Sequence, residues 1–327
     1  MSKSARTGAG YAARLNAFRI GLPNGAGIRE VIARAGTVKG LNEVDLNFPD
    51  HLATIEARDV PDVLAEAGLR LNGFAMRYYS DPAFRIGAFT HPDPATRRKA
   101  IDLTRAGIDA LAEAGGRTMT LWLGEDGFDT PFQCDHKALW AMEVEAIAEV
   151  TGHNPAIDIS IEYKPNEPRA FSLIGDVGTT LLAIKDAGAP NLGVTLDLAH
   201  VLYAGEQPAL SVALVDRHSR LLGVHLNDGY GKRDDGLMVG AVNLPVILEF
   251  LHALEGIGYD GVIYFDTFPD ATGIDPVAEC AHNIETVEAM RALVRELAAA
   301  PEFAAALAAQ DAVKSQRMLM QRLLART

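Results

Sequence analysis

Short runs of apolar and β-branched residues alternate along the chain with longer segments whose apolar residues recur every three or four positions. The short runs have the length of strands, and the longer segments have the periodicity of helices. Strands are expected at residues 18–21, 41–47, 69–75, 117–123, 157–163, 192–198, 221–227 and 261–266. Helices are expected at residues 97–114, 137–150, 179–187 and 244–256. Strands that alternate with helices in this way form parallel sheets from βαβ units.

The eight repeats predict an α/β fold, a closed (β/α)8 TIM barrel over residues 1–285. An open, doubly wound sheet with an added edge strand would give a similar pattern and is the alternative.

The chain is expected to be wholly helical after Pro276, through residues 291–300 and on to Leu324, with a break at Pro301. Residues 286–327 are therefore predicted to form a C-terminal helical extension. Its apolar stripe would be exposed unless it packs on something else. We interpret it as an oligomerisation arm of a homo-dimer or homo-tetramer, and the alternative is a helix folded back on its own barrel.

The composition indicates a protein that neither crosses a membrane nor enters the secretory pathway. No apolar, uncharged run is long enough to span a bilayer. The first twenty residues carry four basic residues without an apolar core, which argues against a secretory signal, and they are expected to be a disordered lead-in. The two cysteines, Cys134 and Cys280, lie far apart, so a cytoplasmic protein with reduced thiols is expected.

The formal net charge of −13 excludes most nucleic-acid binding, because the protein would repel phosphate backbones and no basic run offsets this. A small neutral ligand or a cation is the more natural partner.

Four of the predicted strands end on a charged or titratable residue. Glu162, Asp197, His225 and Asp266 come from four consecutive strands, each in a run otherwise suited to burial. In a barrel these strand ends converge at one face. Three carboxylates and an imidazole would repel one another and lose hydration there unless a cation neutralised them. Oxygen and nitrogen ligands without thiolate favour Mn²⁺, Mg²⁺ or Co²⁺, and leave Zn²⁺ open.

Other candidates lie close to these strand ends. His200, with Asp234 and Asp235, could hold a second cation, or the two aspartates could be solvated loop charges. Lys164 follows Glu162 on the same strand and could stabilise charge on a substrate oxygen, or form a salt bridge with Glu162. Trp122 could wall one face of a sugar or fill the top of the barrel.

Three segments resemble the xylose isomerase family and its barrel relatives. The most specific is Glu-Tyr-Lys-Pro-Asn-Glu-Pro-Arg at residues 162–169, which resembles the family's segment with a metal-ligand glutamate and a catalytic lysine. Residues 81–90 followed by Arg97 and Arg98 resemble the entry to its third helix, and residues 121–127 its tryptophan-containing strand. The likeness runs from about Leu69 to the C-terminal tail.

The resemblance implies roles for these residues. Glu162, Asp197 and Asp266 would bind the structural metal, and Glu162 and Asp266 would also be catalytic residues. Lys164 would contact the carbonyl end of the sugar. His200 and Asp234 would bind the catalytic metal. His225 is more similar to the single-metal pattern of L-rhamnose isomerase and the ketose 3-epimerases, and Trp122, His200 and His225 would contact the substrate.

The sequence also departs from xylose isomerase itself. Pro49 stands where that family presents a histidine after the second strand, and His51 is the candidate to replace it. Gly236 stands where the family has a third carboxylate for the catalytic metal, and Asp235 is the candidate to compensate. Xylose is therefore not expected to be the substrate.

The sequence thus predicts a metal-dependent aldose-ketose isomerase acting on an unphosphorylated sugar. The alternatives are a ketose 3-epimerase, a metal-dependent C-glycoside lyase subunit that needs a partner chain, an endonuclease of the same barrel family, and a non-catalytic sugar-binding protein. The last ligand, Asp266, is shorter than glutamate and reaches less far as an acid or base, which favours the isomerase over the epimerase.

Overall fold

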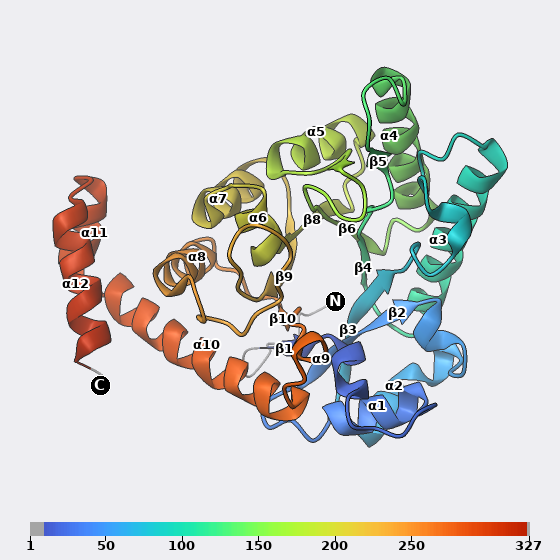
Figure 1. The fold of residues 1–327 in the computed structure, drawn as a ribbon. Helices are drawn as coiled ribbons and strands as arrows, with labels where there is room; N and C mark the ends of the chain where they lie inside the picture. The colour runs from blue at the N-terminus through green and yellow to red at the C-terminus, as the bar shows by residue number, and fades with distance from the viewer. Residues whose placement is uncertain (1–9, 326–327) are drawn as a thin grey trace.

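Residues 10–325 are described by a computed structural model. Eight parallel strands form one sheet in the spatial order β1, β10, β9, β8, β6, β4, β3, β2. They are β1 (Tyr11–Ala13), β2 (Glu43–Phe48), β3 (Arg70–Met76), β4 (Thr118–Leu121), β6 (Asp158–Glu162), β8 (Leu192–Asp197), β9 (Leu221–Leu226) and β10 (Ile263–Phe265). The helices surround the strands as a ring (Figure 1), so the fold is the predicted (β/α)8 barrel.

The two edge strands, β1 and β2, come together through Asn42. The Asn42 backbone N–H donates to the carbonyl of Tyr11 at 3.2 Å, and the Asn42 side-chain oxygen accepts from the Tyr11 N–H at 3.0 Å. These bonds bring the strand edges into register and nearly close the barrel.

Most of the outer helices bury an apolar face toward the interior of the fold. The outer helices are α1 (Ile28–Ala35), α2 (Val60–Glu66), α3 (Pro94–Glu113), α4 (His136–His153), α5 (Val177–Ala187), α6 (Leu198–Tyr203), α7 (Pro208–His218), α8 (Leu244–Gly256), α9 (Pro269–Thr272) and α10 (Pro276–Ala298). Short 3-10 helices are η1 (Leu15–Arg19), η2 (Asp50–Leu52), η3 (Ala57–Asp59) and η4 (Pro82–Phe84). A small antiparallel ribbon, β5 (Gly127–Phe128) with β7 (Phe171–Ser172), was not predicted.

The strand expected at residues 18–21 is wrong. Residues 15–19 form η1, which turns Leu15 and Phe18 into the core, and the first strand is β1, paired with β10. The Tyr-Ala-Ala sequence of β1 is too short to be recognised as a strand and has no β-branched residue. The larger apolar side chain of Phe18 therefore shifted the predicted strand to residues 18–21. The disordered lead-in is also wrong from residue 10 onward, and residues 1–9 lie outside the described part of the chain.

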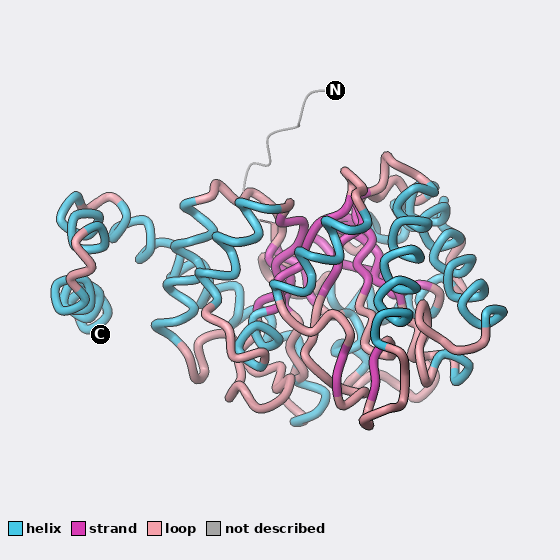
Figure 2. Tube along the Cα trace, turned by 90° about the horizontal axis from the view of Figure 1, so that it is seen from above, coloured by secondary structure: helices cyan, strands magenta, loops and turns pink. Residues whose placement is uncertain are grey.

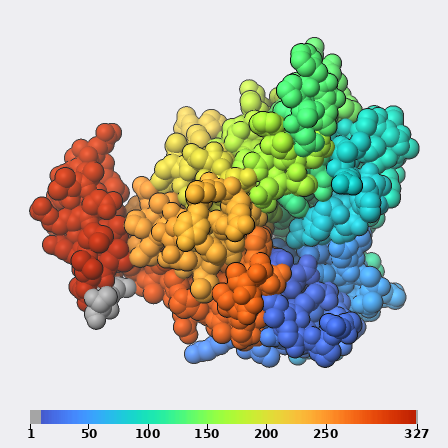
Figure 3. All heavy atoms as spheres, viewed as in Figure 1, coloured from blue at the N-terminus to red at the C-terminus, as the bar shows by residue number. Residues whose placement is uncertain are grey.

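The C-terminal segment is helical, as predicted. Residue 286 lies inside α10, whose Val294 and Leu297 are buried beside α8. Beyond it, α11 (Pro301–Ala308) and α12 (Ala312–Leu324) lie outside the ring of barrel helices (Figures 1 and 2). The space-filling view shows them as a projecting lobe (Figure 3). Over residues 10–325, no helix has the length and apolar character needed to cross a membrane.

Candidate metal centre

The four predicted strand-end residues lie at one end of the barrel. Glu162 and Asp197 are the last residues of β6 and β8, His225 is the penultimate residue of β9, and Asp266 follows β10. Strand register aligns them, because Asp197 is paired with His225, and His225 with Tyr264. Parallel strands therefore carry these side chains to the same mouth of the barrel.

The structure brings all four side chains together. One ligand atom from each of Glu162, Asp197, His225 and Asp266 lies within 4.8 Å of the others. Nδ1 of His225 lies 3.2 Å from Oε1 of Glu162 and 3.8 Å from Oδ2 of Asp197. Glu162, Asp197 and His225 are buried, and Asp266 is half-buried. Ligands on opposite sides of an octahedral Mg²⁺ are about 4.2 Å apart, so the cluster has the dimensions of a coordination sphere.

Without a cation, the charges of this cluster conflict. Burial raises the pKa of Asp197 to about 7, although His200 opposes the shift, and burial also raises the pKa of Asp266. Burial alone would raise the pKa of Glu162 as well, but His225 and His200 lower it to about 2. Burial disfavours the imidazolium of His225, but Glu162 outweighs this and raises its pKa to about 9. The protein therefore needs bound protons to offset the negative charge that a divalent ion would offset instead. The donor set fits such an ion.

His200 lies in α6, which begins directly after Asp197. The carboxylate of Asp197 caps α6 by accepting from the backbone N–H of His200 at 3.1 Å, which turns the imidazole toward the cluster. Nε2 of His200 lies 3.2 Å from Oδ2 of Asp234, and Nδ1 lies 3.7 Å from Oε1 of Glu162. Nδ1 of His200 and Oδ1 of Asp234 are buried without a hydrogen-bond partner among the described residues.

Lys164 belongs to the same group of side chains as His200 and Asp234. No salt bridge between Lys164 and Glu162 is found among the described residues. Its Nζ lies 3.2 Å from Asp234 and 3.0 Å from Glu167. Burial disfavours its charge, but Asp234 and Glu167 raise the pKa of Lys164 above its usual value. Burial would raise the pKa of Asp234, but His200 and Lys164 lower it to about 2. Lys164 therefore stays a cation at neutral pH.

A cavity of about 390 Å³ opens onto both groups. Trp122 lines it, with Nζ of Lys164 5.5 Å from its ring centre, so the tryptophan faces the cavity. The remaining wall was not predicted from the sequence. It consists of Arg14, Asp45, Ala75, Arg77, Tyr79, Glu167, Tyr264 and Phe268.

One of these missed residues did carry a sequence signal. Glu43, Asp45 and Asn47 are polar at every second position of a strand that is otherwise apolar, and period two places them on one face. Asp45 is buried, accepts from Asn72 at 2.7 Å, and has a pKa that burial raises while His225 opposes the shift. Polar alternation in β2 therefore marked a strand whose inner face reaches the site.

Two residues proposed as replacements for missing family groups do not line the cavity. His51 is buried in η2, where Nδ1 accepts from the Asn47 N–H at 3.1 Å and Nε2 lies 3.0 Å from Asn16 Oδ1. Burial, assisted by Arg77, lowers the pKa of His51 to about 3. Asp235 instead accepts from the Tyr230 N–H and from Arg233, both at 2.8 Å. Both side chains are engaged in local structure.

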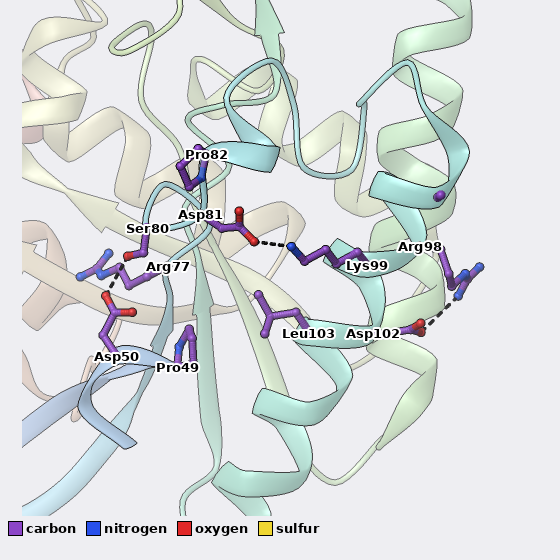
Figure 4. Close-up of a pocket in the computed structure, with 11 residues that line it drawn as sticks. Pro49, Asp50, Arg77, Ser80, Asp81, Pro82, Arg98, Lys99, Asp102 and Leu103 are labelled. Atoms are coloured by element: carbon purple, nitrogen blue, oxygen red, sulfur yellow. Dashed lines mark hydrogen bonds and ion pairs between the residues drawn. The ribbon is translucent and has the colours of Figure 1, made fainter. Parts of the chain in front are cut away.

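A larger hollow, of about 800 Å³, lies beside the mouth, between α3 and the segments that follow β2 and β3 (Figure 4). Most of its polar groups are paired with one another: Lys99 with Asp81, and Ser80 Oγ with Asp50 at 2.7 Å. It brings together no group of carboxylates and histidines comparable to the barrel mouth. We therefore assign the chemistry to the smaller cavity.

Comparison with known proteins places this geometry in a family. The family model described as xylose isomerase-like TIM barrel matches residues 34–296. Xylose isomerase of Thermus thermophilus is 32% identical over 211 residues, which cover 62% of this chain and 54% of that protein. The match thus spans about half the length of this curated relative.

Solved structures share the fold at lower identity. An L-ribulose 3-epimerase superposes with a TM-score of 0.70 and 17% identity, covering 90% of this chain and 99% of the other. D-allulose 3-epimerase from Methylomonas sp. gives a TM-score of 0.68 and 18% identity, covering 86% and 97%. Because the family model covers most of the chain and the barrel agrees with it, this protein belongs to the xylose isomerase-like TIM barrel family.

Proposed function

We propose that the protein is a metal-dependent isomerase that interconverts an unphosphorylated aldose and its ketose. The observation that carries the proposal is the gathering of Glu162, Asp197, His225 and Asp266 within coordination distance of one another. These four residues would hold the ion, and His200 with Asp234 would hold a second one. Mn²⁺, Mg²⁺ and Co²⁺ suit these ligands. Such an ion would polarise the sugar carbonyl and hydroxyl oxygens as a Lewis acid.

The protein's own side chains would orient and stabilise the reacting end of the sugar. Lys164 stays protonated beside Asp234, so its ammonium can donate to the carbonyl oxygen as negative charge develops. Trp122 forms an apolar wall next to this ammonium, which keeps water from one face of the sugar. His200 and His225 present ring nitrogens to the same space. Hydrogen would then move between C1 and C2.

Removal of the metal tests this function directly. Purified protein should convert members of a panel of aldoses and ketoses in the presence of Mn²⁺, as read by product chromatography. Treatment with EDTA should abolish conversion, and added Mn²⁺, Mg²⁺ or Co²⁺ should restore it. Conversion by EDTA-stripped protein at the untreated rate would refute the proposal.

The second candidate is a ketose 3-epimerase. It is favoured by a histidine, His225, in the ligand cluster, and its acid and base would be Glu162 and Asp266. Asp266 is the shorter carboxylate, which supports the isomerase instead. A reaction in D₂O separates the two: full deuterium incorporation indicates epimerisation by proton abstraction, and little exchange indicates a hydride shift. A C-glycoside lyase subunit would show activity only with a partner chain.

Metal affinity should rise with pH. In the metal-free protein, burial raises the pKa of Asp197 to about 7, and Glu162 raises that of His225 to about 9 against the effect of burial. A cation must displace these protons, so protonation competes with binding below those values. The dissociation constant for Mn²⁺, measured by calorimetry between pH 6 and 9, should fall by up to about tenfold per pH unit for each proton released. A constant affinity over this range would contradict the assignment.

We also propose that the C-terminal extension joins two copies of the chain in a homo-dimer or homo-tetramer. Val313, Met320 and Leu324 are exposed on one face of α12, and Leu307 is exposed on α11. All charged residues of α12 are basic, whereas the chain carries a net charge of −13, so a second copy offers complementary charge.

Changing Val313, Met320 and Leu324 to serine should therefore shift the protein to a monomer in light scattering, with an unchanged circular dichroism spectrum. An unaltered mass would refute this role.

A cytoplasmic setting is proposed because the two cysteines, Cys134 and Cys280, are free thiols.

A further inference from the structure

Arg77 stands at the border between the cavity and the neighbouring hollow. It directly follows β3, and its backbone N–H donates to the carbonyl of Phe48 at 2.9 Å, which anchors it at the barrel mouth. Its side chain lines both spaces. Figure 4 shows the guanidinium pointing away from Lys99 and Arg98, the cations on the far side of the hollow. A ligand in the cavity would therefore meet Arg77 at its outer end.

The guanidinium of Arg77 is unpaired over residues 10–325. No ion pair and no side-chain hydrogen bond is found for it there, and its Nε is buried without a partner. The other cations of the cavity are engaged: Arg14 binds both oxygens of Asp270, at 2.7 and 3.0 Å, and Lys164 binds Asp234. A buried N–H group without an acceptor is unfavourable. A ligand oxygen would remove this cost.

A continuous wall connects Arg77 with the reacting end of the cavity. The guanidinium carbon of Arg77 lies 5.8 Å from the ring centre of Tyr79, and the Tyr79 and Trp122 rings meet edge to face at 5.7 Å. Lys164 lies against the other side of this pair, 5.5 Å from the ring centre of Trp122. The rings of Tyr79 and Trp122 thus separate Lys164, at the carboxylate cluster, from the unpaired Arg77 at the outer end of the cavity.

We propose that the substrate is a sugar acid, whose carboxylate pairs with Arg77 while its carbonyl end lies beside Lys164. The inference rests on the proposed isomerase function and specifies its substrate class. A guanidinium presents two parallel N–H groups that match one carboxylate. A dianionic phosphate would want a second free cation, but Lys99 is paired with Asp81, and Asp50 lines the hollow as well. The arrangement therefore fits a carboxylate better than a phosphate.

The test compares uronates with neutral aldoses of the same configuration. D-glucuronate and D-glucose, D-galacturonate and D-galactose, and D-mannuronate and D-mannose are assayed with Mn²⁺, together with D-glucose 6-phosphate. The wild-type kcat/KM should be about 10- to 150-fold higher for the preferred uronate than for its neutral partner. This factor corresponds to the free energy of a hydrogen bond to a charged group. Arg77→Met should remove this preference, because it should lower kcat/KM for the uronate more than for its neutral partner. Calorimetry should show the same loss in uronate affinity.

Arg85→Met is the matched control, because Arg85 is an exposed arginine in the same loop and lies outside the cavity. It should keep the wild-type preference. Equal use of uronates and neutral sugars would overturn the inference and leave the isomerase proposal intact, whereas conversion of neither would overturn both. A preference for the 6-phosphate, or an equal loss for acid and neutral sugars in Arg77→Met, would also overturn it.

Discussion

Glu162→Gln is expected to abolish both metal binding and turnover. Glu162 lies close to both imidazoles, 3.2 Å from His225 and 3.7 Å from His200. Glutamine has nearly the same shape, but it lacks the charge that balances a cation. Loss of several kcal/mol of metal-ion stabilisation corresponds to a fall in kcat/KM of at least about a thousandfold. Calorimetric titration with Mn²⁺ and steady-state kinetics measure the two effects.

Glu143→Gln provides the matched control. Glu143 is a buried glutamate in α4 whose two oxygens have no hydrogen-bond partner among the described residues, and burial raises its pKa well above the usual value. Burial thus favours the uncharged form of Glu143, and an amide should replace it with little effect on metal affinity or rate. If Glu162→Gln kept wild-type metal affinity, or if Glu143→Gln lost it equally, the assignment of the site would be wrong.

Lys164→Met should lower turnover by about a hundred- to a thousandfold, the usual effect of removing one donor that stabilises developing negative charge. Lys164 is held at the cavity by Asp234 and Glu167, and no hydrogen bond or ion pair joins it to Asp197, His225 or Asp266 among the described residues. The variant should therefore keep its affinity for the first metal ion.

Steady-state kinetics at saturating Mn²⁺ measure the effect, with Lys185→Met on α5 as a control of the same chemical change away from the cavity. A variant with normal kcat would contradict the role of Lys164. A variant that failed only because it no longer bound metal would contradict it equally.

The barrel was predictable because most of its strands can be recognised from a local run of apolar residues. Runs such as Ile-Ser-Ile in β6 and the apolar stretch of β8 are long enough, and flanked by clear enough helices, to locate strands within a few residues. The exception is β1, where Tyr11 and two alanines carry little strand signal. Its place depends on pairing with β10 and on Asn42, contacts far apart in the sequence.

The convergence of the cluster was predictable for a related reason. A carboxylate at the end of a buried strand is conspicuous, and a barrel brings such ends together. Loop residues carry no comparable signal. Asp234 and Asp235 are adjacent in sequence, yet only Asp234 reaches Lys164 and His200, because the backbone turns Asp235 toward Tyr230 and Arg233.

The importance of Arg77 likewise could not be read from the sequence. An arginine after a strand is ordinary, and what distinguishes this one is that its side chain has no hydrogen-bond or ion-pair partner among residues 10–325. Its neighbours Tyr79 and Trp122 lie far apart in sequence and meet only across the barrel mouth. Contacts between side chains of different loops depend on the tertiary structure, and the local sequence pattern does not predict them.

The position of the bound ion is the most direct test of the whole account. Crystals grown with Mn²⁺ and measured at the manganese absorption edge should show an anomalous peak within coordination distance of Glu162, Asp197, His225 and Asp266. Manganese bound only elsewhere, or no peak among these four side chains at saturating Mn²⁺, would contradict the central claim.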